Sequence, residues 1–158
     1  MKIEFDVMMT TSKMYDYMLR HSMTSFSGIL GEIVGILMIV AFTLYHNWAY
    51  LLAGVVIVLY VPVTLYMKAK TQVAMNAIFK EPLHYVLDES GITISSGENS
   101  DSLPWNGIYK VISTTASIII YTNKINACVF PKADLGSRKD DVIEMISTHV
   151  DPKKVNIR

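Results

Sequence analysis

A nearly unbroken apolar stretch covers residues 28–67, and it limits what this chain can fold into more than any other feature. A transmembrane helix needs about 20 mainly apolar residues to cross roughly 30 Å of hydrocarbon. Residues 28–47 and 48–67 each reach that length, and only a few polar residues around His46 separate them. The alternative, a buried soluble hairpin, is disfavoured because the rest of this 158-residue chain is too short to surround two such helices. The sequence therefore predicts a transmembrane hairpin over residues 28–68.

The residues that flank the hairpin indicate its orientation. Tyr45, Trp48 and Tyr50 gather at the predicted turn, where amphipathic rings suit the membrane interface. The turn contains no Lys or Arg, whereas basic residues stand on both outer flanks. Because cytoplasmic loops are enriched in basic residues, both termini are expected in the cytoplasm. The flanking basic residues are Lys13, Arg20, Lys68, Lys70 and Lys80.

Glu32 is the one carboxylate inside the apolar stretch. We expect it about one turn inside the membrane surface, where headgroups, water or a snorkelling Lys68 could pair with it. The alternative is a functional carboxylate that relays protons or binds a partner. Gly31 and Gly35 have the GxxxG spacing of closely packed helices, and packing against the second helix is favoured over dimerisation. Counting back from the turn places Gly35 opposite Tyr60.

Composition excludes several classes of function. The formal net charge is 0, from 14 basic and 14 acidic residues, so nothing in the overall charge suggests a nucleic-acid partner. The single cysteine, Cys128, excludes an internal disulfide and is expected to be buried. The sequence has no phosphate-binding glycine loop, HExxH or G-x-S-x-G motif, and its four histidines are scattered. We therefore expect a protein that is not an enzyme and needs no metal or cofactor.

The segment before the hairpin combines a strand and a helix. Apolar residues alternate over residues 3–9, which is the period of a β-strand. Residues 11–21 follow with an amphipathic helical pattern, and Thr11 or Ser12 could cap this helix. Its apolar stripe comprises Met14, Tyr17, Met18 and His21. The methionines near this end are interpreted as core and membrane-surface packing rather than as metal ligands.

After the hairpin, short strand patterns alternate with turn signals. Residues 83–88 and 92–95 predict a β-hairpin, residues 97–102 a polar loop, and residues 127–131 a final strand. Two further strands, over residues 108–115 and 117–122, are separated by a turn near Ala116. Residues 137–150 predict a helix, with Ser137 and Asp140 as its capping box. Its apolar stripe comprises Val142, Ile143, Ile146 and Val150.

These elements predict an α+β fold, in which an antiparallel β roll is closed by the C-terminal helix. The strand at the N-terminus has an apolar face that needs cover, and an edge of the same roll could provide it. We therefore expect one cytoplasmic domain formed by residues 1–27 and 83–158, with the transmembrane hairpin of residues 28–68 inserted between them.

Several short motifs in this order resemble one protein family. LRHS precedes the apolar hairpin, and LHYVLDESGITISS, LPW, VFPK and PKKV follow it. The chain thereby resembles the YcxB-like family of small bacterial membrane proteins, most specifically over residues 85–132. The resemblance implies a pleckstrin-homology-like (PH-like) domain at the inner face of a bacterial cell membrane. It implies no catalytic residues.

Trp105 and several basic residues are candidate contacts. Trp105 follows Leu103 and Pro104, and it is expected either to anchor a corner of the fold or to contact a ligand or partner. Basic side chains could face the anionic inner leaflet, or they could form an ordinary solvated surface. The candidate contacts for a partner or lipid are Glu32, Tyr60, Lys68, Trp105, Lys132, Arg138, Lys153 and Lys154.

The sequence favours a membrane-tethered adaptor or sensor that binds a membrane protein, a peptide or a lipid headgroup. The first alternative is protection against membrane-active peptides, including self-immunity to a bacteriocin. The second is an accessory subunit of a transporter, which would use Glu32 and Tyr60. The lipid bilayer is the expected partner in each case, and a homo-oligomer remains open.

Overall fold

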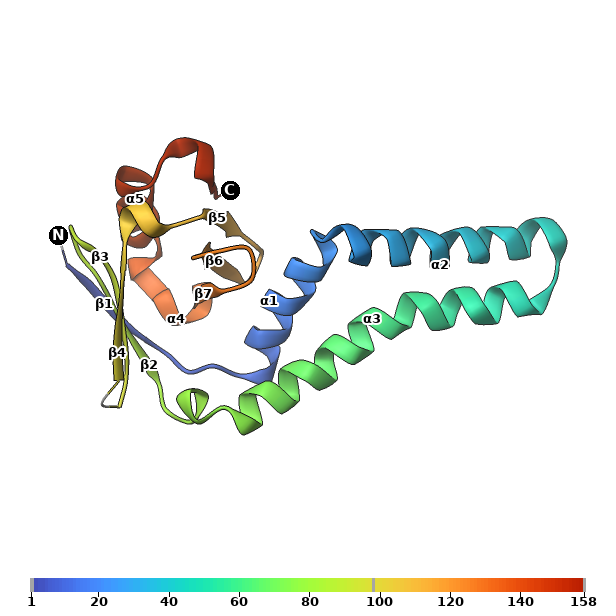
Figure 1. Ribbon diagram of the computed structural model, residues 1–158, viewed down its shortest axis with the longest axis horizontal. Helices are drawn as coiled ribbons and strands as arrows, with labels where there is room; N and C mark the ends of the chain where they lie inside the picture. The colour runs from blue at the N-terminus through green and yellow to red at the C-terminus, as the bar shows by residue number, and fades with distance from the viewer. Residues whose placement is uncertain (1, 98, 158) are drawn as a thin grey trace.

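Two long helices project as a hairpin from a β-sheet domain in the computed structural model, which describes residues 2–97 and 99–157 (Figure 1). They are α2 (Phe26–Tyr45) and α3 (Trp48–Met75). Only His46 and Asn47 separate them, His46 in the left-handed conformation with φ 51° and Asn47 accepting a hydrogen bond from the Ala49 amide at 3.0 Å. The prediction of two long apolar helices is confirmed.

α3 continues beyond the predicted end at Met67 as far as Met75. Residues 68–75 contain no glycine or proline, so nothing in the sequence stops the helix when its apolar stretch ends. Ala69 is fully buried in this extension. Asn76 ends α3 and also caps the short 3-10 helix η1 (Ala77–Lys80), because its side chain accepts a hydrogen bond from the Ile78 amide.

A pair of glycines fixes the contact between α2 and α3. A Cβ atom on Gly54 would lie 2.8 Å from the carbonyl oxygen of Gly35, so only hydrogen fits at this point. Gly35 packs against Gly54, Ile57 and Val58, whereas Tyr60 is 66% exposed. The packing of Gly35 on the second helix is confirmed, but its predicted position opposite Tyr60 is wrong. The close approach of the two glycines sets which residues of α2 and α3 lie opposite each other. Counting from the turn did not predict this pairing.

α1 (Thr11–Met23) joins the sheet domain to the hairpin. Its cap is Thr10, one residue before the two predicted candidates, because the chain is still extended there and its hydroxyl accepts a hydrogen bond from the Lys13 amide. Met14 is buried, and Tyr17 and Met18 pack against the core as the stripe predicts.

The first sheet is antiparallel and combines strands from both sides of the hairpin. The N-terminal strand pairs with the first strand after the hairpin, with Ile3 opposite Leu87 and Val7 opposite Leu83. Residues 97–102, predicted as a loop, largely belong to a strand. This edge strand is exposed along most of its length, so it lacks the alternation that identifies half-buried strands. In sheet order the strands are β1 (Ile3–Val7), β2 (Leu83–Leu87), β3 (Gly91–Ser96) and β4 (Asn99–Pro104).

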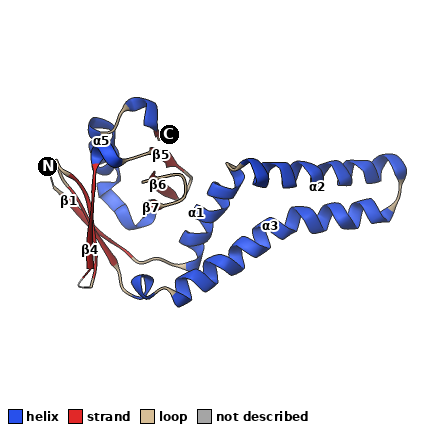
Figure 2. Ribbon diagram, in the orientation of Figure 1, coloured by secondary structure: helices blue, strands red, loops and turns tan. Residues whose placement is uncertain are grey.

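The second sheet lies nearer the C-terminus and has a fully buried strand, β6, at its centre (Figure 2). Its three longer strands lie where the sequence predicts them, including the turn near Ala116. The fourth strand runs parallel to β5 and is too short to leave a sequence pattern. In sheet order the strands are β7 (Ala127–Pro131), β6 (Ser117–Tyr121), β5 (Lys110–Ser113) and β8 (Val155–Asn156).

Short helices connect and cover the sheets. The predicted C-terminal helix is present with Val142 and Ile146 buried, but its predicted capping box is wrong. A 3-10 turn leads directly into this helix, and the Arg138 side chain at its N-cap position makes no capping hydrogen bond. The helices are η2 (Trp105–Gly107), α4 (Lys132–Leu135), η3 (Gly136–Arg138), α5 (Lys139–His149) and η4 (Pro152–Lys154).

Three aromatic rings join the two sheets in one core. The Phe130 ring of β7 lies edge-on to Phe5 of β1 and to Tyr85 of β2, with centroids 5.0 Å and 4.8 Å away. Phe5 and Tyr85 stack at 5.5 Å. Residues before and after the hairpin therefore share one core, and the fold is mixed α+β with two largely antiparallel sheets.

Candidate functional site

Two of the three candidates on the hairpin helices, Glu32 and Tyr60, lie apart from the sheet domain on α2 and α3. Glu32 Oε1 is buried and has no hydrogen-bond partner among the described residues. Lys68, one of its expected partners, instead lines a cavity next to the sheets.

Three of the five basic candidates bind backbone carbonyl groups of the domain. Lys132 Nζ donates to Thr114 O at 2.5 Å, Lys154 Nζ donates to Ile108 O at 2.8 Å, and Arg138 donates to Glu4 O. Lys153 is exposed. These side chains hold strands and turns together, so they do not form the single lipid-facing surface that their shared charge suggests.

Trp105 anchors a corner of the fold, as its position after Leu103 and Pro104 suggests. It is 7% exposed, and its Nε1 donates to the carbonyl oxygen of Asp88 at 2.8 Å. Its ring stacks on His149 with centroids 5.1 Å apart. Little of the indole surface is left to contact a ligand or partner.

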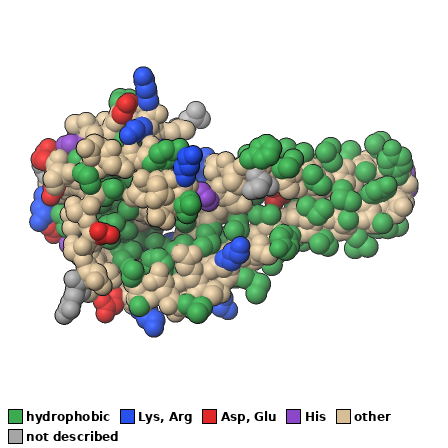
Figure 3. All heavy atoms as spheres, viewed as in Figure 1, with side chains coloured by type: hydrophobic (Ala, Val, Ile, Leu, Met, Phe, Trp, Pro, Cys, Tyr) green, Lys and Arg blue, Asp and Glu red, His purple; other side chains and the backbone are tan. Residues whose placement is uncertain are grey.

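A large cavity, of about 920 Å³, lies where both sheets meet α1, α3 and η1. Hydrophobic side chains line the recess that Figure 3 shows beside the base of the hairpin. Pockets of this size, mostly apolar with a few polar groups, are typical binding sites for small ligands. The apolar lining includes Met14, Met18, Leu65, Phe79, Leu83 and Val129.

A smaller, polar cleft of about 300 Å³ adjoins this cavity. His21 and Ser25 line both spaces, and Thr24, Tyr109, Lys110 and Lys124 complete the cleft. The loop between β6 and β7 lies along the boundary, because Lys124 faces the cleft while Ile125 and Asn126 face the cavity. Tyr17 Oη holds this loop against α1 by donating to the carbonyl oxygen of Ile125 at 2.6 Å.

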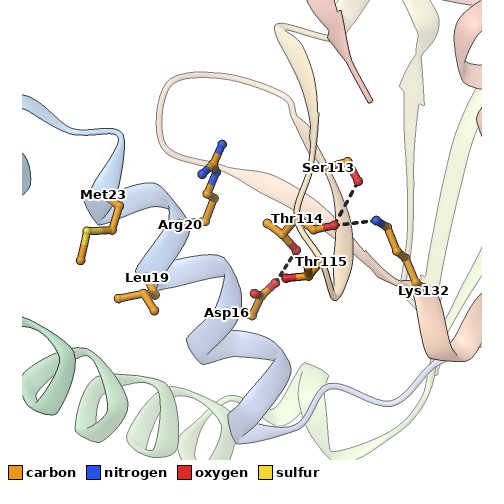
Figure 4. Close-up of a pocket in the computed structure, with 8 residues that line it drawn as sticks. All are labelled: Asp16, Leu19, Arg20, Met23, Ser113, Thr114, Thr115 and Lys132. Carbon is orange, nitrogen blue, oxygen red and sulfur yellow. Dashed lines mark hydrogen bonds between the residues drawn. The ribbon is translucent and has the colours of Figure 1, made fainter. Parts of the chain in front are cut away.

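A third cleft, of about 520 Å³, separates α1 from the turn between β5 and β6 (Figure 4). Its polar groups already bind one another: Thr114 Oγ1 donates to Asp16 Oδ2 at 3.0 Å, and Lys132 Nζ donates to Thr114 O. Arg20 extends from α1 toward this space. The first bond fastens α1 to the turn between β5 and β6, and the second fastens α4 to the same turn, so the cleft has a structural role.

The ionisable groups buried near the large cavity stay neutral at physiological pH. Burial raises the pKa of the Tyr85 hydroxyl, which lines the cavity, and raises the pKa of the Cys128 thiol to about 12. Cys128 is buried, as predicted. Asp101 is the sole carboxylate among the described residues that line the cavity. The cavity therefore offers an apolar volume with little charge of its own.

Sequence reasoning missed this cavity because its walls come from both sides of the hairpin. Met9, Met14 and Met18 were the available signal, since flexible methionine side chains suit adaptable apolar sites. Their pattern alone does not separate a cavity wall from a filled core. In the part of the chain that the structure describes, no group of three His, Cys, Asp or Glu side chains could hold a metal ion.

Comparison with known families identifies part of the domain. Residues 87–147 match the family described as YcxB-like protein. Over this segment the chain is similar to the YcxB-like family. The YcxB-like segment runs from the end of β2 into α5 and includes Val129 and Lys124, whereas the cavity walls from α1 and α3 lie outside it. No curated protein and no solved structure matched the chain.

Proposed function

We propose that the chain is a non-enzymatic adaptor or sensor, in which the α2–α3 hairpin spans the bacterial cell membrane and a PH-like domain binds a ligand at the inner face. The observation that carries the proposal is the exposed apolar surface of the hairpin beside a domain with its own core. Only 6% of the apolar window of each helix is buried. Such a surface is too large and too apolar to leave in water.

The ends of the hairpin support insertion into a bilayer. Tyr45 and Tyr50 contact each other at the turn, with ring centroids 5.9 Å apart, and Phe42 and Trp48 do so at 5.1 Å. Aromatic rings are enriched at the membrane interface, and the basic residues lie at the opposite end of both helices. This asymmetry favours a cytoplasmic sheet domain with both termini on the same side.

The position of the large cavity favours a binding function. It lies where α1 and the extension of α3 meet the two sheets, so an occupant would touch both the membrane anchor and the domain. The arrangement of two antiparallel sheets followed by a helix is compatible with a PH-like roll. Tyr85 and Cys128, which are buried near the cavity, are neutral. The mainly apolar walls of the cavity therefore suit binding better than acid–base or nucleophilic chemistry.

A photocrosslinking residue placed at Ile125 tests this function in the full chain in native membranes. Ile125 is 72% exposed at the cavity mouth, and Glu144 on the exposed face of α5 is the matched control position. We expect a discrete adduct from position 125 that is absent from position 144. The adduct should decrease when Ala127→Leu narrows the cavity.

The mass of the adduct distinguishes the alternatives. A lipid or membrane protein supports the sensor or adaptor function, and a membrane-active peptide supports immunity instead. An adduct of twice the chain's mass identifies a homo-oligomer contact. Identical adducts from both positions, unaffected by Ala127→Leu, would contradict a binding function for the cavity.

A further inference from the structure

The large cavity and the polar cleft together have the shape of a site for an amphiphile. One part is an apolar space of about 920 Å³, and the other is a polar space of about 300 Å³. His21 and Ser25 stand in the walls of both, so one molecule could occupy the two spaces at once. Its apolar portion would contact methionine, leucine and valine side chains, and its polar portion would contact the cleft.

The charge of the cleft indicates which charge the polar portion of the amphiphile should carry. Lys110 and Lys124 line it together with His21, and no carboxylate is among its described lining residues. Lys124 is exposed on the β6–β7 loop, and Lys110 Nζ lies 4.6 Å from the centre of the Tyr121 ring, a contact that leaves its N–H groups free to donate. An anionic group suits this cleft.

The location of the two spaces indicates where the amphiphile comes from. Ser25 caps the first helix of the hairpin, and its hydroxyl accepts a hydrogen bond from the Gly28 amide at 3.2 Å. Leu65 and Lys68 belong to α3 at the same end of the hairpin. With the hairpin in a bilayer, both spaces lie beside the inner leaflet. A lipid could then move one acyl chain into the cavity without exposing it to bulk water.

We infer that the cavity and cleft bind an anionic lipid of the inner leaflet, with one acyl chain in the apolar cavity and the headgroup beside Lys110 and Lys124. This inference rests on the proposed membrane tether and names the ligand of the domain. Hydrophobic burial holds the chain, because each buried methylene group favours binding. The two lysines give the preference for an anionic headgroup.

The test uses the full chain in phosphatidylcholine nanodiscs that contain a trace of lipid with a diazirine in its acyl chain. One sample contains labelled phosphatidylglycerol, a second labelled phosphatidylcholine, and a third labelled palmitate. We expect the phosphatidylglycerol probe to label peptides from α1 and β7 at least about fivefold more than the neutral probe, since each basic residue near an anionic lipid contributes roughly that factor. All probes should label the hairpin.

Matched variants separate the two parts of the site. Ala127→Leu should reduce labelling of α1 and β7 severalfold. Ala133→Leu, at an exposed position of α4, should not reduce it. Lys110→Gln with Lys124→Gln should bring the ratio of anionic to neutral labelling close to one, whereas Lys153→Gln should leave it unchanged. Protection of buried Cys128 from a thiol reagent confirms that each variant is folded.

Each result has a defined consequence. Labelling of the hairpin without labelling of α1 or β7 would overturn the lipid site and leave the membrane tether intact. Equal labelling by the two phospholipids would overturn the anionic headgroup, and stronger labelling by palmitate would make a free fatty acid the ligand instead. Failure of every probe to label the hairpin would overturn the membrane tether itself.

Discussion

Lys13 and Asp134 form an ion pair that joins segments 121 residues apart, with Lys13 Nζ 2.6 Å from Asp134 Oδ2. The same ammonium group donates to the carbonyl oxygen of Met8 at 2.9 Å. The pair fixes α1, on one side of the hairpin, to α4 on the other. Because α1 also forms part of the cavity wall, this contact connects the stability of the domain to the shape of its candidate site.

Replacing Lys13 with methionine should lower the free energy of unfolding by about 1–2 kcal/mol. Both partners are about four-fifths buried, so the loss should exceed that of an exposed pair and stay below that of a fully buried one. Chemical unfolding of the detergent-solubilised chain measures the change, with Lys153→Met as the exposed control. Equal stability of the two variants would show that the ion pair does not hold α1 in place.

Phe5→Ala should destabilise the domain by about 3–5 kcal/mol, the usual cost of removing a buried phenylalanine ring. Phe5 is 3% exposed and contacts Tyr85 and Phe130, so its loss leaves a cavity between the sheets. Glu4→Ala, at the neighbouring exposed position, should change stability by less than about 0.5 kcal/mol. Protease resistance of residues 83–158 is a second readout, and resistance unaffected by Phe5→Ala would mean that this segment folds without β1.

Gly54→Leu should separate α2 from α3. Its Cβ atom alone would lie 2.8 Å from the carbonyl oxygen of Gly35, and such overpacking costs about 1–3 kcal/mol. Gly31→Leu is the matched control, because a Cβ atom there meets nothing within 4 Å. Thermal unfolding in mild detergent compares the variants. If Gly31→Leu proved the more damaging change, α2 would use its Gly31 face against another chain.

The contact between His149 and the β2–β3 turn should weaken as pH rises. His149 donates to Met145 O at 2.9 Å and to Glu89 Oε2 at 3.0 Å, and these two bonds raise the pKa of its imidazolium above 6.5. These two bonds therefore contribute fully to the free energy of unfolding below the unfolded-state pKa of His149. Their contribution is lost as pH rises through its folded-state pKa.

At each pH, the free energy of unfolding of His149→Gln is subtracted from that of the native chain. This difference isolates the contribution of His149 from that of the other three histidines. The difference should be largest near pH 6 and should become smaller by pH 8, as expected for a partly exposed pair. A difference that does not change with pH would show that folding leaves the pKa of His149 unchanged.

The features that sequence patterns predicted well are those with a strong period. The apolar helices, the amphipathic stripe of α1 and the mainly apolar strand β6 lie where their residues place them. β4 was missed because an exposed edge strand has polar residues on both faces, and β8 because it is only 2 residues long. Patterns of apolar residues report burial, so elements with little burial leave no trace.

The candidate site was harder to predict than the fold, for a different physical reason. Lys132 and Lys154 looked available for lipid, but long side chains can reach across a fold, and these two bind backbone carbonyl groups. Lys110 and Lys124 carry the same charge and face the cleft instead. Only the tertiary arrangement distinguishes these two pairs of lysines.

Accessibility of single cysteines in intact cells tests the membrane-spanning hairpin and the cytoplasmic domain most directly. The native Cys128 is 7% exposed, and burial raises its pKa to about 12, so it should not react in the folded chain. Asn47→Cys, at the exposed turn between α2 and α3, should react with a membrane-impermeant maleimide in intact cells. Ser100→Cys, on the exposed edge strand β4, should react only after the cells are permeabilised. Labelling of Ser100→Cys in intact cells, or of neither position before permeabilisation, would contradict a hairpin that crosses the membrane with its sheet domain inside.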